Sequence, residues 1–204
     1  MSSEAQQRVL GLVMAAGFSR RFGSADKRLA KLADGSTLLG ATLAQLQAEF
    51  SAPGSGGRLA VVIRPDDDPA CLGISEQLDL LRAPNAGAGL GASIADAARA
   101  VSADPVLNGF DSLAIMLGDM PGLKPDTIRA LVSASGRDRI VRPRYRQQPG
   151  HPVLFGRDFW SGLCNLQGDE GARAVIAANR AALRQLDLDD AGVIADIDTP
   201  AQLR

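Results

Sequence analysis

The first chemistry that the sequence suggests is phosphate binding, by the loop that follows its first long apolar run. The run ends in Ala15, Ala16 and Gly17, whose small side chains let another group approach the backbone closely. Arg21 and Lys27 then bring positive charge to a loop rich in backbone N–H groups, which suits the oxygens of a polyphosphate. The spacing is that of neither a P-loop nor a dinucleotide-binding fingerprint. A tight strand-to-helix turn with two solvated cations remains the alternative.

A second candidate group is the carboxylate of Asp119, which stands just beyond the apolar run 112–117. Open α/β sheets bind their ligands at the carboxyl ends of the strands, where this acid is expected to lie. It could instead cap the helix expected over 124–135. The consecutive acids 66–68 look like a metal cluster, but they lie in a polar turn between two prolines, and we expect a solvated helix start there.

Two further segments carry side chains suited to binding. Asn85, Gly89 and Ser93 lie in a glycine-rich stretch that leads into an alanine-rich helix, where free N–H groups and the positive end of the helix dipole are presented. A flexible loop capped by Ser93 is the alternative. The segment 142–151 holds three arginines in five residues, the single tyrosine and the single histidine. These arginines can equally form an ordinary solvated edge.

Apolar runs separated by helical stretches supply the elements that must position these groups. Short apolar runs predict buried strands at about 10–16, 59–63, 78–83, 112–117, 140–142 and 183–188. Helices are predicted over 38–50, from 93 to about 101, over 124–135 and from the segment 166–173. Strands that alternate with helices predict an α/β fold with a three-layer, mostly parallel sheet.

The composition predicts a single globular domain over residues 1–204. Apolar residues make up 46% of the chain, and 22 basic residues balance 23 acidic ones, so the net charge of −1 gives no reason to expect nucleic acid or a membrane surface as a partner. No apolar stretch approaches the ~20 residues that span a bilayer. The distant Cys71 and Cys164 argue against a disulfide framework or structural zinc. We expect a disordered N-terminus over residues 1–8 and, without an apolar signal-peptide core, a cytoplasmic protein.

Together and in this order, the motifs resemble those of the MobA-like nucleotidyltransferases, which transfer a nucleoside monophosphate from an NTP. The resemblance covers about residues 10–203 and implies a Rossmann-like fold of the nucleotide-diphospho-sugar transferase type. It rests on Ala15-Ala16-Gly17-x-Ser19-x-Arg21-x-Gly23 with Lys27, Asn85-x-x-x-Gly89-x-Gly91-x-Ser93, Leu117-Gly118-Asp119-Met120-Pro121, Gly150-His151-Pro152-Val153-Leu154-Phe155 and Asp196-x-Asp198-Thr199-Pro200.

The resemblance also implies roles for individual residues. In that family the opening loop wraps the triphosphate and the second segment lies over the base and ribose. The implied nucleotide-binding residues are Ala15, Ala16, Gly17, Ser19, Arg21, Lys27, Asn85, Gly89 and Ser93. Similarity makes Asp119 a Mg²⁺ ligand and suggests that Asp198 meets the metal from the opposite side. Arg21, Lys27 and Asp119 are the implied catalytic residues.

Two features resemble the cytidylyl-transferring branch, whose acceptor is the molybdopterin form of the molybdenum cofactor. Ala16 stands where the guanylyl branch usually has glycine, and a methyl group there could crowd a purine edge. The Gly-His-Pro-Val-Leu-Phe motif follows a basic, aromatic loop that suits a phosphorylated pterin. The resemblance thus implies CTP and molybdopterin as substrates, with a molybdoenzyme or its chaperone as a further candidate partner.

The residues expected to bind the acceptor are Arg142, Arg144, Tyr145 and His151, and the Gly-Asp-x-Gly-Ala-Arg element at 168–173 is expected to help shape the pocket. His151 can orient the loop by hydrogen bonding, and we do not expect it to act as a general base. Two enzyme alternatives keep the chemistry but transfer GMP, or use a sugar or polyol phosphate as acceptor. A third alternative is a non-catalytic carrier that hands the cofactor to a molybdoenzyme.

Overall fold

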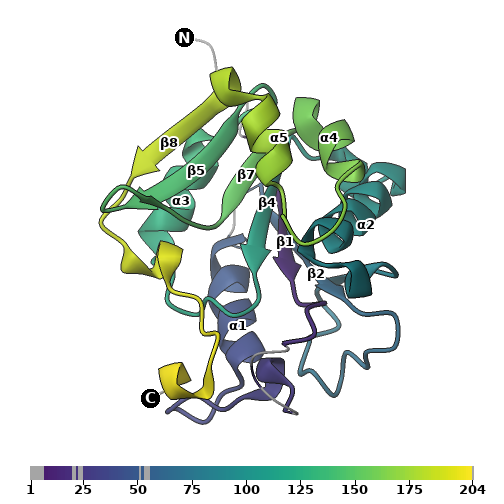
Figure 1. The fold of residues 1–204 in the computed structure, drawn as a ribbon, viewed down its shortest axis with the longest axis vertical. Helices are drawn as coiled ribbons and strands as arrows, with labels where there is room; N and C mark the ends of the chain where they lie inside the picture. The colour runs from purple at the N-terminus through teal and green to yellow at the C-terminus, as the bar shows by residue number, and fades with distance from the viewer. Residues whose placement is uncertain (1–6, 20–21, 23–24, 51, 53–55, 204) are drawn as a thin grey trace.

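The computed structural model describes residues 7–19, 22, 25–50, 52 and 56–203, which build an eight-stranded sheet between helices (Figure 1). All six residues of its central strand, β1 (Val9–Met14), are buried. This is typical of an uninterrupted apolar run in a strand that is covered on both faces. β1 pairs in parallel with β2 (Arg58–Ile63) and with β4 (Ser112–Leu117), and β3 (Asp79–Arg82) pairs in parallel with β2.

The other half of the sheet contains antiparallel strands. β7 (Val153–Gly156) lies between β4 and β5 (Ile140–Tyr145) and runs antiparallel to both. β6 (Gln148–Pro149) folds back on β5, while β8 (Leu183–Asp187) pairs with β5 in parallel. The strand order is β3-β2-β1-β4-β7-β5-β6, with β8 beside β5. The sheet is therefore mixed and mostly parallel, which confirms the predicted fold class, although no strand was predicted at the position of β7.

Helices cover both faces of the sheet and complete the three layers (Figure 1). The α-helices of the described residues are α1 (Leu38–Phe50), α2 (Leu90–Ala103), α3 (Pro125–Ala134), α4 (Trp160–Cys164) and α5 (Arg173–Ala178). One core lies between the sheet and α1 and α3, where Leu39 and Leu131 are buried. The other lies between the sheet and α2, α4 and α5, where Ile94 and Trp160 are buried.

Short 3-10 helices form several of the connections. They are η2 (Lys27–Leu29), η3 (Ala86–Ala88), η4 (Leu107–Gly109), η5 (Arg157–Phe159), η6 (Arg180–Ala182), η7 (Ala191–Ile194) and η8 (Pro200–Leu203). Among the described residues, no helix combines the length and the apolar character needed to cross a membrane.

The acidic turn after β2 differs from the prediction of a solvated helix start. The connection from β2 to β3 consists of turns and bends and contains no helix. The side chain of Asp67 in this turn is 11% exposed and is paired with Arg28. The carboxylate of Asp67 therefore pairs with a side chain of the protein and is largely shielded from solvent. The neighbouring prolines and acids in the sequence do not reveal this pairing.

The N-terminal segment expected to be disordered, 1–8, lies outside the described residues up to residue 6. Arg8, its last residue, donates its backbone N–H to Asp111 (3.2 Å), and its guanidinium group lies 4.8 Å from the centre of the Phe110 ring. The chain is thus held against the rest of the protein from Arg8 onward.

Candidate active site

The loops that follow β1 and β4 leave the sheet at the same edge, because the two strands are parallel neighbours. Gly118 N donates to the carbonyl oxygen of Met14 (3.1 Å). A Cβ atom added to Gly118 would lie 3.1 Å from that same oxygen, so glycine permits the close approach of the two loops. Asp119 is thereby held beside the loop that begins at Ala15, at the edge where α/β sheets bind ligands.

Lys27 connects the first loop to two acids that are distant in the sequence. Its Nζ lies 2.6 Å from Asp119 Oδ2 and 2.8 Å from Asp198 Oδ1, and its side chain is buried. Burial opposes the charge on Lys27, but the hydrogen bonds to both carboxylates outweigh it and raise the pKa of Lys27. Burial also raises the pKa of Asp119, against the hydrogen bond from Lys27, and the negative charges of Asp196 and Asp198 reinforce this rise. The carboxylates of Asp119 and Asp198, with Asp196 nearby, concentrate negative charge at this point, and a bound cation would offset that charge.

The two acids beside Lys27 also have a donor set suited to a small divalent cation. Asp119 Oδ1 is buried and has no hydrogen-bond partner among the described residues. Within that part of the chain, no group of three or more histidine, cysteine or acidic side chains forms a metal cage. Mg²⁺ does not require one, because it keeps several waters and is usually bound by one or two carboxylates together with substrate phosphates. Asp119 and Asp198 therefore fit such an ion.

A second buried cation, Arg28, fixes the start of the first loop. Its guanidinium group donates to the carbonyl of Ala15 (2.9 Å), to both oxygens of Asp67 (2.5 and 2.8 Å) and to Asp26 (2.6 Å). Burial opposes ionisation of Asp67, but hydrogen bonds from Arg28 and from the backbone of Arg64 outweigh it, so the pKa of Asp67 is lowered. The sequence prediction missed this network. The available signal was the run of three charged residues at 26–28, which includes Arg28.

The remaining predicted residues of the first loop differ in solvent exposure. The guanidinium group of Arg64 donates to the carbonyls of Ala16 and Gly17. Gly17 is exposed, whereas Ala16 is 1% exposed and packs in the core. The Ala16 methyl group therefore does not line the open side of the loop, contrary to the expectation that it would crowd a purine. Ser19 adopts a left-handed backbone conformation with φ of 49°. Arg21 lies outside the described residues.

In the second predicted segment, the polar side chains bind groups of the protein itself. Asn85 donates from its backbone N and from Nδ2 to the two oxygens of Asp96 (2.7 and 2.9 Å). The buried Ser93 hydroxyl donates to the carbonyl of Gly89 (3.1 Å) at the start of α2. Gly89 has a φ of 118°, and a Cβ atom there would lie 2.1 Å from Asp169 Oδ1. The structure thus brings Asn85, Gly89 and Ser93 together as a packed support for the helix.

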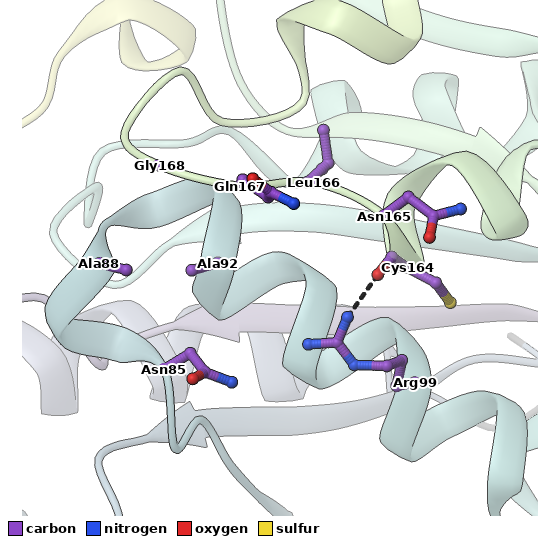
Figure 2. Close-up of a pocket in the computed structure, with 9 residues that line it drawn as sticks. All are labelled: Asn85, Ala88, Ala92, Arg99, Cys164, Asn165, Leu166, Gln167 and Gly168. Carbon is purple, nitrogen blue, oxygen red and sulfur yellow. Dashed lines mark hydrogen bonds between the residues drawn. The ribbon is translucent and has the colours of Figure 1, made fainter.

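A pocket of about 440 Å³ opens beside this support, between α2 and the chain that precedes α5 (Figure 2). The guanidinium group of Arg99 donates there to the carbonyl of Cys164 and to Asp96 (2.6 Å). The lining residues are Asn85, Ala88, Ala92, Arg99, Cys164, Asn165, Leu166, Gln167 and Gly168. This lining includes Asn85, a predicted nucleotide-binding residue, and Gly168, the first residue of the element expected to help shape the acceptor pocket. The acids beside Lys27 do not belong to it.

The predicted acceptor residues of β5 are engaged to different degrees. Arg144 forms a two-pronged ion pair with Asp187 on β8 (2.9 and 2.7 Å). The guanidinium group of Arg146 lies over the ring of Tyr145, 5.1 Å from the centre of that ring. Arg142 Nε is buried and has no hydrogen-bond partner in the described part of the chain. Burial, and then the nearby charge of Arg173, lowers the pKa of Arg142. Arg142 Nε is therefore a buried donor that no described group of the protein uses.

His151 occupies a position close to these arginines. Its backbone N donates to the carbonyl of Val193 (2.7 Å), and its Nδ1 is buried and finds no partner among the described residues. Burial, and then the charge of Arg142, lowers the pKa of His151 below its ordinary value of 6.5. The imidazole is thus neutral near pH 7 and adds no positive charge to the site.

Residues 11–188 of the chain match the MobA-like NTP transferase domain. The chain belongs to this family. It is accordingly a nucleotidyltransferase, as the sequence motifs predicted. No curated protein matches the chain closely enough to be counted as a relative.

Solved structures of mycobacterial proteins resemble this MobA-like chain over nearly its whole length. The crystal structure of a homologue of Mycobacterium tuberculosis rv0371c from Mycobacterium sp. strain JC1 is 31% identical, with a TM-score of 0.77, and the match covers 97% of this chain and 94% of that chain. Rv0371c from M. tuberculosis H37Rv is 27% identical, with a TM-score of 0.78 and coverage of 97% and 96%. The Rv0371c complex with manganese gives 24% identity, a TM-score of 0.75 and the same coverage of 97% and 96%.

Proposed function

We propose that this MobA-like transferase moves CMP from CTP to the molybdopterin form of the molybdenum cofactor and releases pyrophosphate. The observation that carries the transferase site is Lys27, buried between Asp119 and Asp198 at the carboxyl edge of β1 and β4. The choice of CTP and molybdopterin is supported by the sequence resemblance, through Ala16 and the Gly-His-Pro-Val-Leu-Phe motif.

The proposed reaction joins two anions. An oxygen of the acceptor phosphate attacks the α-phosphorus of CTP, and the bond from that phosphorus to the pyrophosphate oxygen breaks. The residues must therefore neutralise charge and hold the reacting atoms in line, and no covalent intermediate with the protein is needed. In this proposal Lys27 and Arg21 take up negative charge on the departing pyrophosphate.

A divalent cation completes the proposed charge balance. Asp119 and Asp198 are the residues that would hold it, and the unpartnered Oδ1 of Asp119 supports this assignment. Bound Mg²⁺ supplies Lewis-acid stabilisation of the phosphate oxygens. The existence of a manganese complex of M. tuberculosis Rv0371c also favours a divalent cation in this family.

The acceptor is proposed to approach from the side of β5 and β7. Arg142 is partly exposed and its buried Nε has no partner among the described residues, so its guanidinium group is available to pair with a phosphate oxygen. A phosphate monoester is largely doubly ionised near pH 7, because its second pKa is about 6, and so it needs no general base. This agrees with His151, whose lowered pKa keeps it neutral but whose buried Nδ1 does not face solvent. Arg144 and Tyr145 are proposed to frame the acceptor loop.

The experiment that tests this function incubates the protein and Mg²⁺ with isolated molybdopterin cofactor and one NTP at a time. Mass analysis identifies the product, and released pyrophosphate is counted. We expect the cytosine dinucleotide of the cofactor and one pyrophosphate per product. A guanine dinucleotide would replace the cytidylyl assignment, and product only with a sugar or polyol phosphate would replace the acceptor. Cofactor binding without pyrophosphate release from any NTP would leave a carrier.

A further inference from the structure

Asp190 is a buried acid that the proposed reaction does not use. It is 2% exposed, and it lies in the connection after β8, directly before η7. Its Oδ2 accepts hydrogen bonds from the backbone N of Lys124 (2.9 Å) and from the hydroxyl of Thr127 (2.7 Å), while its Oδ1 accepts from Gly192 N (2.9 Å). One carboxylate thus joins two loops that are more than sixty residues apart.

The first of these loops carries Asp119. Lys124 and Thr127 form the start of α3, and Lys124 gives this helix no side-chain cap of its own. Asp190 supplies the cap from outside, where a negative charge is also favoured by the helix dipole. The loop from β4 to α3, with Asp119 in it, is therefore anchored at its far end by Asp190.

The second loop carries Asp198. A Cβ atom on Gly192 would lie 2.1 Å from the carbonyl of Gly122, so the two loops are in backbone contact beside Asp190. Further along, Ile197 N donates to the carbonyl of Asp119 (3.1 Å). Backbone contacts between the two loops, from Gly192 against Gly122 to Ile197 against Asp119, therefore set the position of Asp198 relative to Asp119. Asp190 lies at the first end of this row of contacts.

The turn that follows Asp190 also contacts the segment around His151, which belongs to the proposed acceptor site. The carbonyl of Val193, in η7, accepts the hydrogen bond from His151 N (2.7 Å). A Cβ atom on Gly150 would lie 2.2 Å from that carbonyl oxygen, which shows how closely the two segments pack. The turn that begins at Asp190 therefore contacts both the loop of Asp119 and the loop of His151.

We infer that Asp190 is a positioning residue, which holds Asp119 and Asp198 at the separation that lets both bind one divalent cation. This inference rests on the proposed metal role of those two acids. The residue touches neither the metal nor the substrate, and it acts through the α3 cap and the contact between Gly192 and Gly122.

The test is the affinity of the purified full chain for Mn²⁺ without nucleotide, measured from the spin-resonance signal of free Mn²⁺. Asp190→Asn keeps the side-chain shape but replaces an accepting oxygen with a donor. We expect its dissociation constant for Mn²⁺ to rise at least about tenfold, the lower end for loss of a group that orients a metal ligand. The matched control is Asp189→Asn, because Asp189 is the exposed neighbour and the charge change is the same.

Thr127→Val gives a second variant that keeps Asp190 charged and removes one of its donors. We expect a smaller weakening of Mn²⁺ binding in the same direction, so that the inference can be judged even where Asp190→Asn does not fold. Unfolding temperatures, measured in parallel, separate structural damage from positioning. A folded Asp190→Asn protein, or a folded Thr127→Val protein, with wild-type Mn²⁺ affinity would overturn the inference.

Asp119→Asn separates this inference from the proposed function. If Asp119→Asn abolishes Mn²⁺ binding and Asp190→Asn leaves it intact, the metal site stands and the role of Asp190 falls. If Asp119→Asn binds Mn²⁺ as the wild type does, the metal site itself is misplaced, and the role of Asp190 falls with it.

Discussion

Replacing Lys27 with methionine removes the cation that stands between Asp119 and Asp198. Methionine keeps a long side chain but leaves the two carboxylates facing each other. Because the ammonium group already neutralises the two carboxylates that we assign to the metal, it competes with a divalent cation for their charge in the absence of nucleotide. The variant is therefore expected to be less stable in a chelator, to gain more stability from Mn²⁺ and to turn over more slowly.

The size of the stability loss follows from how the Lys27 pair is solvated. The Asp119 and Asp198 side chains are 24% and 39% exposed, so the pair is neither fully buried nor on the surface. Removing one partner of a buried pair costs about 3–5 kcal/mol, whereas exposed pairs contribute about 0–1 kcal/mol. We expect an intermediate loss of about 2–3 kcal/mol, which corresponds to about 4–12 °C in Tm for a chain of this length.

The assay is thermal unfolding in EDTA and in saturating Mn²⁺. Lys31→Met is the matched control, since Lys31 is exposed and its ammonium group donates to the carbonyl of Gly35 (3.1 Å). Lys27→Met should show the lower Tm in EDTA and the larger Mn²⁺-induced rise, while the control follows the wild type. Equal Tm values in EDTA and equal Mn²⁺ shifts for all three proteins would refute the placement of Lys27 as a counterion to the two acids.

Three other outcomes are expected. Asp119→Asn should lower the rate of pyrophosphate release at least ~10²-fold, the scale of losing one electrostatic element at a reacting phosphate, and should leave a folded protein. Asp67→Asn should lower the free energy of unfolding by about 1–3 kcal/mol, because it weakens the partner of buried Arg28. Since the pKa of Asp67 is lowered on folding, its contribution is present above the unfolded pKa of about 3.9 and is lost as the pH falls through the folded value, so the variant should lose less stability on acidification. Competition between nucleotides should favour CTP over GTP, because the motifs resemble those of the cytidylyl-transferring branch.

Each of these outcomes has a simple control. Asp66→Asn serves for both aspartate variants, because Asp66 is exposed in the same turn as Asp67. Turnover in Asp119→Asn equal to that of Asp66→Asn would remove Asp119 from the site. Acid unfolding curves for Asp67→Asn that parallel the wild type would contradict the ionised pair with Arg28. Equal use of CTP and GTP would discard the cytidylyl assignment and keep the transferase.

Local patterns in the sequence predicted much of the fold. The helix over Leu38–Phe50 and the strand over Ser112–Leu117 have the predicted bounds, because apolar spacing alone decides which face of each is buried. The short strand Val153–Gly156 was not predicted, since three apolar residues that follow a glycine and a proline are too few to show a period of their own. Its antiparallel pairing depends on strands that precede it in the chain.

The partners of the charged side chains could not be predicted in the same way. Arg28 pairs with Asp67, and Arg144 pairs with Asp187, through contacts that exist only once distant strands are in register. Asp198 was placed near Asp119 by resemblance alone, and the structure joins them through Lys27. Asp190 carried no sequence signal, because its role as a cap for α3 requires the loop after β8 to fold against a different loop.

The central claim is nucleotidyl transfer at the site of Lys27, Asp119 and Asp198, and the fate of two phosphorus labels tests it most directly. CTP labelled at the α-phosphorus and CTP labelled at the γ-phosphorus are each incubated with the protein, Mg²⁺ and molybdopterin cofactor. We predict that the α label appears in the pterin product and the γ label in pyrophosphate, and that both transfers are at least ~10²-fold slower with Asp119→Asn. Both labels remaining on CTP, or the γ label appearing as orthophosphate, would contradict the claim.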